Sequence, residues 1–347
     1  MRTDSTRNSL LGVLLCVAGC GGGSINTAVI SSGAGGTGTI EALPLADGAT
    51  LTRLADNGSA SGTLGGTSDA IQRPVSITPA DARVADDANF FGSGAWSLLR
   101  VGSSNNRGVI AGNGIVDDVP IAWTWDGRPA LRYSVPAGHT IGKVVGPADD
   151  GSFAADTYNP ATFEQEILLW QANGSRSVIY RIVPVKAGMN LFGMASNGWL
   201  GGIERDGILL TPKIYDGSWR AMPFDLMTCS CEAMRINARG QMLLSPRPDL
   251  GSDARGYIVS SGGATLLPQP EGGVRYTDLN DVGDVVGNAA QGPVLLVGGV
   301  LRDLNAYANS AALGWRLLTA DAINNRRQVV GTGVLQGRTR WYRLSLQ

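Results

Sequence analysis

Short runs of alternating apolar and polar residues follow one another along most of the chain, and turns rich in Asn, Asp and Gly separate them. Each repeat has a turn that is followed by a short apolar run, such as "VIAG" from Val109, "VVGN" from Val285 and "VVGT" from Val329. A fixed period in the forties is typical of propeller blades and of helical solenoids. The last turn residue recurs at intervals of 42 to 50 residues, at Gly58, Gly108, Gly151, Gly198, Gly240, Gly283 and Arg327.

A second alternating run begins later in each repeat. This run distinguishes a propeller from a helical solenoid. Examples are "IAWTW", which ends at Trp125, and "ILLW", which ends at Trp170. Most such runs lead into Asp-Gly, Asn-Gly or Gly-Gly, which favour hairpins because their residues adopt positive φ. No segment keeps a 3.6-residue period, so the pattern disfavours the helical solenoid. Four short antiparallel strands per repeat predict an all-β fold, a β-propeller of seven four-stranded blades.

The two ends of the chain are predicted to meet in one blade. The last repeat stops at "RWYRLSLQ", before the strand that should follow. The N-terminal "TIEALPLADG" from Thr39 is similar to "VLRDLNAYAN" from Val300 in pattern and position. We therefore expect residues 39–45 to complete the last blade, which pairs a sheet edge that would otherwise stay open.

Composition narrows the function classes. Charged residues make up 16% of the 347 residues, below the roughly 25% of a typical soluble domain. The net charge is −1, which disfavours a nucleic-acid partner because such a partner requires a basic face. His139 is the only histidine, so one chain cannot build a multi-histidine metal site. We expect a monomer without a metal or cofactor.

The first nineteen residues are predicted to be a lipoprotein signal peptide. Arg2 and Arg7 precede a short apolar run from Leu10 to Val17, which is too short to span a bilayer. The following "VAGC" resembles the bacterial lipobox, in which Cys20 receives the lipid. The alternative is an ordinary signal peptide with a chance cysteine.

Lipidation would place the mature protein on a membrane of the bacterial cell envelope. Gly21 after the cysteine, rather than Asp, resembles the outer-membrane sorting pattern of bacteria with two membranes. Residues 20–38 are predicted to form a flexible Gly/Ser-rich tether, and residues 39–347 the propeller. The tether contains Gly33-x-Gly35-x-x-Gly38, which we interpret as a spacer because no strand and helix flank this dinucleotide-like motif.

The repeat resembles a known family. "INN-x-x-Q-V-V-G" from Ile323, followed by an aromatic-containing strand, "DG" and a "DL"-type strand, is similar to the HAF-type bacterial extracellular repeat. The resemblance covers about residues 50–347 and is strongest after Ile236. It implies blade-like repeats in an envelope or secreted protein, and it carries no catalytic motif. The sequence departs from the pattern at Arg327, which replaces the turn glycine.

Cys229 and Cys231 are the candidate redox pair. In an oxidising compartment they are expected to form a disulfide or to pack inertly, and the alternatives are a redox-active thiol or half of a metal site.

Other candidate site residues have simpler interpretations. No G-x-S-x-G motif accompanies His139, so we expect a loop histidine rather than a catalytic base. The adjacent carboxylates are expected to be solvated turn residues rather than glycosidase pairs. They are Asp86 and Asp87, Asp117 and Asp118, and Asp149 and Asp150. Recurring aromatic residues such as Trp123 and Trp170 are expected to pack between blades rather than to bind sugars.

The sequence therefore predicts a lipid-anchored envelope propeller that binds or scaffolds an envelope protein or glycan, and that is not an enzyme. The alternative is a hydrolase or lyase that acts on a glycan or peptidoglycan fragment near the propeller axis. One fold can serve many unrelated functions. The enzyme alternative therefore rests only on analogy with other propellers.

Overall fold

The computed structural model describes most of the region predicted to be the propeller. The predicted signal peptide, Cys20, the predicted tether up to residue 37, and Asp86 and Asp87 lie outside the described residues. The described residues are 38–346 except for 46–47, 66–69, 79–81, 86–89, 91–93, 183–186, 230, 248–254 and 308–312.

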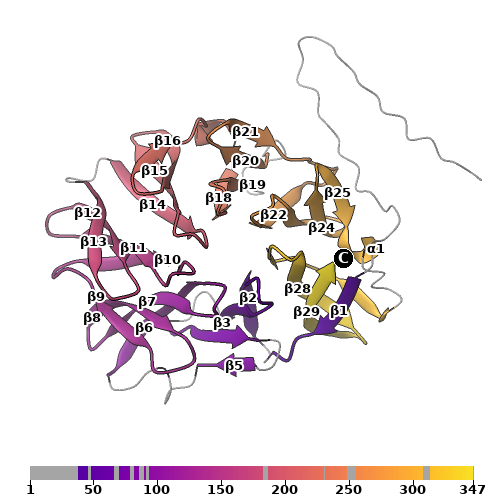
Figure 1. The fold of residues 1–347 in the computed structure, drawn as a ribbon, viewed down its shortest axis with the longest axis horizontal. Coiled ribbons are helices and arrows are strands. Elements are labelled where there is room, and N and C mark those ends of the chain that lie inside the picture. The colour runs from indigo at the N-terminus through magenta and orange to yellow at the C-terminus, as the bar shows by residue number, and fades with distance from the viewer. Residues whose placement is uncertain are drawn as a thin grey trace, which may run out of the picture.

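Seven antiparallel sheets stand around a common axis and form a seven-bladed β-propeller (Figure 1). The prediction of the fold class is confirmed. Blade 1 comprises β2 (Ala49–Leu54), β3 (Ala60–Leu64), β4 (Arg73–Ile77) and β5 (Ala82–Val84). Blade 2 comprises β6 (Trp96–Ser104), β7 (Ile110–Val116), β8 (Val119–Trp125) and β9 (Leu131–Ser134). Blade 3 comprises β10 (Thr140–Val145), β11 (Phe153–Asn159), β12 (Glu164–Trp170) and β13 (Arg176–Ile182).

The remaining blades follow the same order, with the first-named strand nearest the axis. Blade 4 comprises β14 (Ala187–Met194), β15 (Leu200–Asp206), β16 (Leu209–Tyr215) and β17 (Trp219–Ala221). Blade 5 comprises β18 (Cys231–Ile236), β19 (Met242–Pro246), β20 (Tyr257–Ser260) and β21 (Gly263–Leu266). Blade 6 comprises β22 (Val274–Leu279), β23 (Val285–Ala289), β24 (Gly292–Val297) and β25 (Val300–Asp303). Two short helices, η2 (Leu226–Thr228) and α1 (Leu304–Tyr307), lie in links between blades.

Blade 7 contains strands from both ends of the chain. It comprises β26 (Trp315–Leu317) with β27 (Ala322–Ile323), then β28 (Gln328–Leu335), β29 (Arg338–Leu346) and the N-terminal β1 (Gly38–Ala42). β1 pairs with β29 in antiparallel register, from Gly38 opposite Leu346 to Ala42 opposite Tyr342. The predicted closure of the ring by the N-terminal segment is confirmed.

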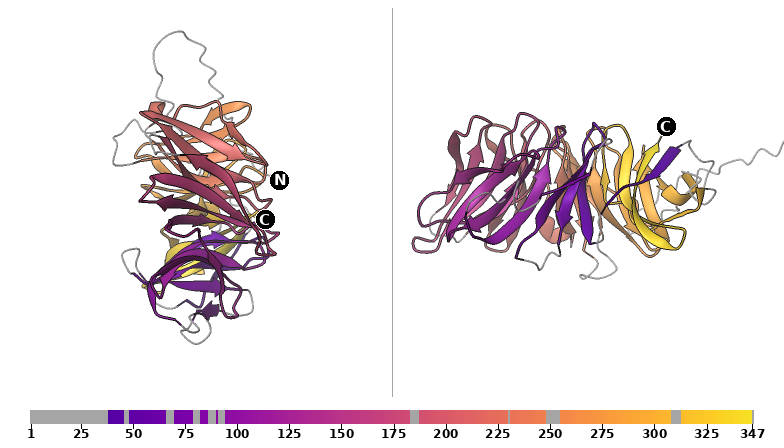
Figure 2. Two further views of the ribbon diagram at one scale, coloured as in Figure 1. Left: turned by 90° about the vertical axis from the view of Figure 1, so that its left-hand side faces the viewer. Right: turned by 90° about the horizontal axis from the view of Figure 1, so that it is seen from below.

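The strand order defines two faces of the ring, which Figure 2 shows edge-on. The turn face carries the turns between the first and second strands of every blade, because neighbouring strands are antiparallel. The opposite face carries the loops between second and third strands and the links between blades. β1 begins at the turn face, since Gly38 pairs with Leu346 at the end of β29. Any segment that precedes β1 therefore joins the ring at the turn face.

The hydrophobic core lies between the blades. Trp123, Trp170 and Tyr342, which belong to the strand preceding the outer hairpin, are almost fully buried. Phe153 of blade 3 stacks on Trp170 at a centroid distance of 5.0 Å and contacts Tyr133 of blade 2 edge-on at 4.9 Å. The recurring aromatic residues thus pack the sheets rather than line an open groove.

Candidate functional site: two belts of turns around an axial hollow

The seven turns next to the axis form the most regular polar feature of the molecule. We call them the inner turns; they are residues 55–58, 105–108, 148–151, 195–198, 237–240, 280–283 and 324–327. The glycine at the fourth position has a positive φ of 72 to 94° in six of them. Arg327 takes this position in the seventh turn with a φ of 55°. Its Nε donates to Asp284 of the preceding blade at 2.7 Å.

Asparagine at the first position fixes a turn and joins it to the next blade. Asn280 Oδ1 accepts hydrogen bonds from the backbone N–H groups of Val282 at 3.2 Å and Asp284 at 2.8 Å. Its Nδ2 donates to the backbone oxygen of Asn324 in the next blade at 3.1 Å. We call the set of these contacts, from the first residue of a turn to the next blade, the first-position belt. The same contacts to the next blade start at Asn105, Asn237 and Asn324, with distances of 2.8 to 2.9 Å.

Three turns have alanine at the first position, and their third residue takes over the capping. In the turn that begins at Ala55, Asn57 Oδ1 accepts from Ser59 N at 2.8 Å. Asp150 and Asn197 do the same in the turns that begin at Ala148 and Ala195. The four asparagine turns instead carry Arg107, Arg239, Val282 or Arg326 at the third position. Each turn therefore has one side chain that accepts the N–H of the residue directly after the turn.

The second residues of the inner turns form a second-position belt. At six of the seven junctions between blades, the backbone N–H of the second residue donates to the residue at the second position in the next blade. Asn325 N donates to Asp56 Oδ1 at 2.8 Å, and Asp56 N donates to Asn106 Oδ1 at 2.8 Å. The other steps run from Ala238 to Asp281, from Asp281 to Asn325, from Asn106 to Asp149, and from Asp149 to the backbone oxygen of Ser196.

The second-position belt is interrupted between blades 4 and 5. Ala238 has a methyl side chain, which offers Ser196 no acceptor. The two blades are joined here by Asn197 Nδ2, which donates to the backbone oxygen of Ala238 at 3.0 Å. This contact comes from the third turn position, so it lies outside both belts.

The belts surround a small hollow at the axis on the turn face, which is partly open to solvent. A ring of buried apolar side chains contributes to its lining: Leu54, Ile236, Leu279 and Ile323. Polar residues complete the lining: Arg53, Asp56, Asn106, Ser196, Asn237, Asn280, Asp281, Asn324 and Asn325.

Charged side chains of the innermost strands meet below the belts. Asp278 is fully buried, and it accepts from Ile323 N at 2.9 Å and from Arg235 Nε at 3.0 Å. Arg235 Nη2 also donates to the backbone oxygen of Thr52, so it links blade 5 to blade 1. Arg53 Nη1 lies 3.8 Å from Asp278 Oδ1. One carboxylate thus faces two guanidinium groups.

β-bulges bring these three residues to the same level. The register of the innermost strand shifts just before Arg53, Arg235 and Asp278. Each of them pairs with the residue three positions after its turn glycine: Ser61, Leu243 and Val286. A bulge inserts an unpaired residue and redirects the following side chain. The strand pattern contains no signal for a bulge, so sequence analysis missed this cluster.

His139 lies away from the hollow, just before β10 and at the end of that strand opposite the inner turn. Its side chain is buried, and its Nε2 is 3.8 Å from Glu166 Oε2 of β12. Arg181 contacts the other oxygen of Glu166. The histidine therefore neighbours a carboxylate, but neither residue lines the hollow. Among the described residues, no group of three or more His, Cys, Asp or Glu side chains is placed to hold a metal ion.

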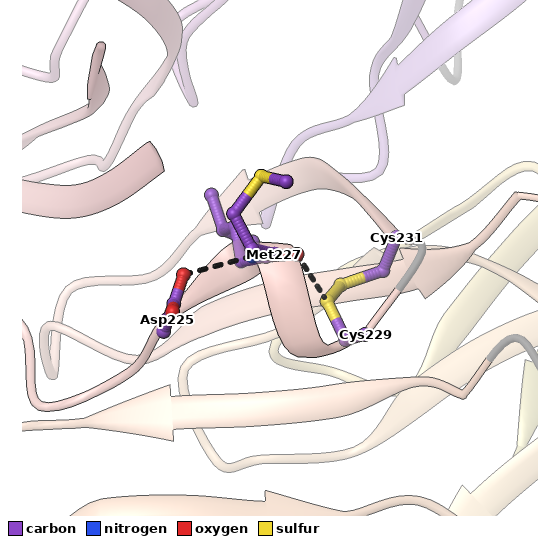
Figure 3. Close-up of a disulfide and its surroundings, with 5 residues drawn as sticks. Asp225, Met227, Cys229 and Cys231 are labelled. Atoms are coloured by element: carbon purple, nitrogen blue, oxygen red, sulfur yellow. Dashed lines mark hydrogen bonds between the residues drawn. A yellow bond between two sulfur atoms is a disulfide. The ribbon is translucent and has the colours of Figure 1, made fainter. Parts of the chain in front are cut away.

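Cys229 and Cys231 form a disulfide in the link between blades 4 and 5 (Figure 3), with a Cα–Cα distance of 5.2 Å. Asp225 Oδ1 caps the preceding helix η2 by accepting from Met227 N at 2.9 Å. The backbone N–H of Cys229 donates to the backbone oxygen of Leu226 at 3.4 Å. The disulfide fastens this link on the face opposite the inner turns.

The predicted carboxylate pairs have separate places. Asp117 and Asp118 form the tip of the hairpin between β7 and β8, both with positive φ. Asp149 and Asp150 occupy the second and third positions of an inner turn, where Asp149 belongs to the second-position belt and Asp150 caps the turn.

Comparison with known proteins identifies the fold. No family model matches the chain, and no curated protein matches it significantly. Among solved structures, a catalytically inactive variant of virginiamycin B lyase from Staphylococcus aureus with quinupristin is 11% identical, with a TM-score of 0.52, covering 89% of this chain and all of that one. YCF48 bound to a D1 peptide is 12% identical, with a TM-score of 0.52 and coverages of 92% and 98%.

A third solved structure is also a β-propeller. The β-propeller domain of the Trilobed protease from Pyrococcus furiosus is described as having an open velcro topology, and it is 14% identical with a TM-score of 0.53. The match covers 86% of this chain and 94% of that one. At these identities the likenesses show the fold alone: the chain is a seven-bladed β-propeller.

Among the described residues, no helix is long and apolar enough to cross a membrane.

Proposed function

We propose that the chain is a lipid-anchored propeller of the bacterial cell envelope, and that it binds or scaffolds an envelope protein or glycan through the axial hollow. The observation that carries this proposal is the construction of the hollow. Two belts of hydrogen bonds hold its polar lining in place before any ligand arrives. Binding sites gain affinity when their contacts are held ready, because less conformational entropy is lost on binding.

The position of the hollow fits an anchored protein. The hollow opens on the turn face, and β1 begins at this same face. The tether that we infer from residues 20–38 would therefore leave the outer edge of blade 7 on the face where the hollow opens. The lipobox-like "VAGC" supplies the anchor in this proposal.

The chemistry of the hollow favours binding over catalysis. Its described lining contains no histidine, and its two carboxylates are Asp56 and Asp281. Asn325 Nδ2 donates to both of them at 2.8 Å, so these carboxylates already serve the second-position belt. A general acid and base are usually positioned free to exchange protons with a substrate.

Photo-crosslinking in cells tests the function and the location together. A photoreactive residue replaces Arg107, an exposed inner-turn residue, and in a second variant it replaces Ile208, which is 81% exposed on the opposite face. We expect one envelope protein or glycan to crosslink from Arg107 and not from Ile208.

The Cys20→Ala variant is the control for the anchor. We expect it to leave the membrane fraction and to lose the crosslink. A membrane fraction that is unchanged by this substitution contradicts the lipid anchor. Crosslinks from Ile208 alone contradict the hollow as the binding site, and turnover of an envelope polymer by the purified full chain favours the enzyme instead.

A further inference from the structure

The guanidinium group of Arg53 is the least satisfied charge in the axial region. It lines the hollow, and its side chain is 23% exposed. Among the described residues it makes no hydrogen bond, and its contact with Asp278 is 3.8 Å long. Arg235, by contrast, donates to Asp278 and to two backbone oxygens. A guanidinium group has five donors, so Arg53 has several available to a ligand.

The surroundings of Arg53 strengthen its attraction for an anion. The buried ring of Leu54, Ile236, Leu279 and Ile323 shares the hollow with it. Burial lowers the pKa of Arg53, and the nearby Arg235 lowers it further, while Asp278 acts in the opposite direction. An arginine remains charged under these conditions, because its pKa lies far above neutrality. Charges interact more strongly in such partly apolar surroundings than in bulk water.

Two carboxylates of the same hollow limit which anions can enter. Asp56 and Asp281 both line it. Their negative charges act against the lowering of the Arg53 pKa by burial, so they lie close to this guanidinium group. Each carboxylate accepts one backbone N–H and one N–H of Asn325, and carboxylate oxygens have lone pairs for further donors. A phosphate dianion would be repelled by them, and a simple cation would be repelled by Arg53.

We infer that the hollow binds a zwitterionic group, whose carboxylate pairs with Arg53 and whose ammonium group lies near Asp56 and Asp281. The chemical class is an α-amino acid, or the same group carried on a larger envelope molecule. This inference rests on the proposed function and names the chemistry of its ligand. A group with both charges satisfies both sides of the hollow, while a group with one charge meets repulsion from the other side.

Isothermal titration of the full chain in detergent tests the inference, with glycine as the probe. Acetate, N-acetylglycine, glycinamide and inorganic phosphate are the matched controls, because each lacks one of the two charges or replaces the carboxylate. We expect glycine to bind at millimolar concentration and each control to bind at least tenfold more weakly, a difference of about 1.4 kcal/mol. No binding of glycine at these concentrations, or equal binding of acetate or phosphate, overturns the inference.

Two substitutions locate the bound carboxylate. Arg53→Met is expected to weaken glycine binding at least tenfold, while Arg128→Met, which removes an exposed arginine from an outer hairpin of the same face, leaves it unchanged. Equal effects of the two substitutions overturn the assignment to Arg53. The comparison among glycine, acetate and glycinamide uses the unchanged protein, so it stands even where Arg53→Met folds poorly. If Arg107 crosslinks in cells but glycine does not bind, the proposed binding function stands. Only the inference of a zwitterionic ligand is then overturned.

Discussion

Asparagine is the residue that makes the inner turns and joins the blades. Its side-chain oxygen accepts the N–H groups that the turn leaves free, and its side-chain nitrogen reaches a carbonyl of the next blade. Serine or aspartate offers only part of this combination, since neither carries two N–H donors beside an acceptor. The geometry explains why the repeat keeps Asn where the third position of the turn carries no side-chain acceptor.

At the residue scale, we predict that Asn280→Ala lowers the free energy of unfolding by about 3 kcal/mol, because buried N–H groups and one carbonyl lose their partner. Adding Val282→Asn is expected to restore about 1 kcal/mol, since Asn57 caps its turn from this third position beside Ala55. Urea unfolding of the single and double variants measures both values. Strictly additive effects of the two substitutions would contradict the prediction that Asn at the third position takes over capping from the first position.

The N-terminal strand is the element that closes the ring. Arg343 of β29 is buried, and its Nε donates to Glu41 Oε1 of β1 at 2.5 Å. Its Nη1 donates to the backbone oxygen of Gly58 in blade 1. One side chain therefore ties the closing strand to its own blade and this blade to the next.

At the element scale, we predict that Arg343→Met destabilises the protein by about 2 kcal/mol, because the carbonyl of Gly58 loses its donor and Glu41 loses its charged partner. Glu41→Gln is the matched control. The Glu41 side chain is 55% exposed, so its substitution should cost less than about 1 kcal/mol. Thermal and urea unfolding give the comparison, and equal costs would show that the contact with Gly58 contributes little.

The whole ring is held by packing between blades and by the two belts at the axis. The second-position belt runs from Ala238 around to Ser196 and is interrupted between them. The first-position belt has a contact only where the first residue of the inner turn in the preceding blade is Asn. The belts therefore couple the blades unevenly around the axis, and the junction between blades 4 and 5 relies on Asn197.

At the scale of the whole molecule, we predict that Ala238→Asn stabilises the ring by about 1 kcal/mol, because its side-chain oxygen offers Ser196 N an acceptor and completes the belt. Ala238→Leu, which has a similar size and no acceptor, serves as the control and should give no gain. Differential scanning calorimetry compares the two variants. A gain with Leu that equals the gain with Asn would assign the effect to packing instead.

The repeat determined much of the fold because local chemistry dictates it. Positive φ at the turn glycines, Asn-Gly and Asp-Gly hairpins, and alternating strands depend on residues that are neighbours in the sequence. The match between the segment after Thr39 and the segment after Val300 was enough to predict ring closure. The sequence also contains the exchange between capping from the first turn position, as at Asn280, and capping from the third, as at Asn57. Aligning the repeats on the turn glycine would have shown it.

The hollow was decided by tertiary structure alone. Arg53, Arg235 and Asp278 lie on blades 1, 5 and 6, and their sequence positions give no reason to bring them together. Ring closure places these blades around one axis, and bulges set the three side chains at one level. His139 and Glu166 also met only through folding. The sequence by itself therefore determined the blades, whose contacts are local, while the closed ring decided which charges share the axis.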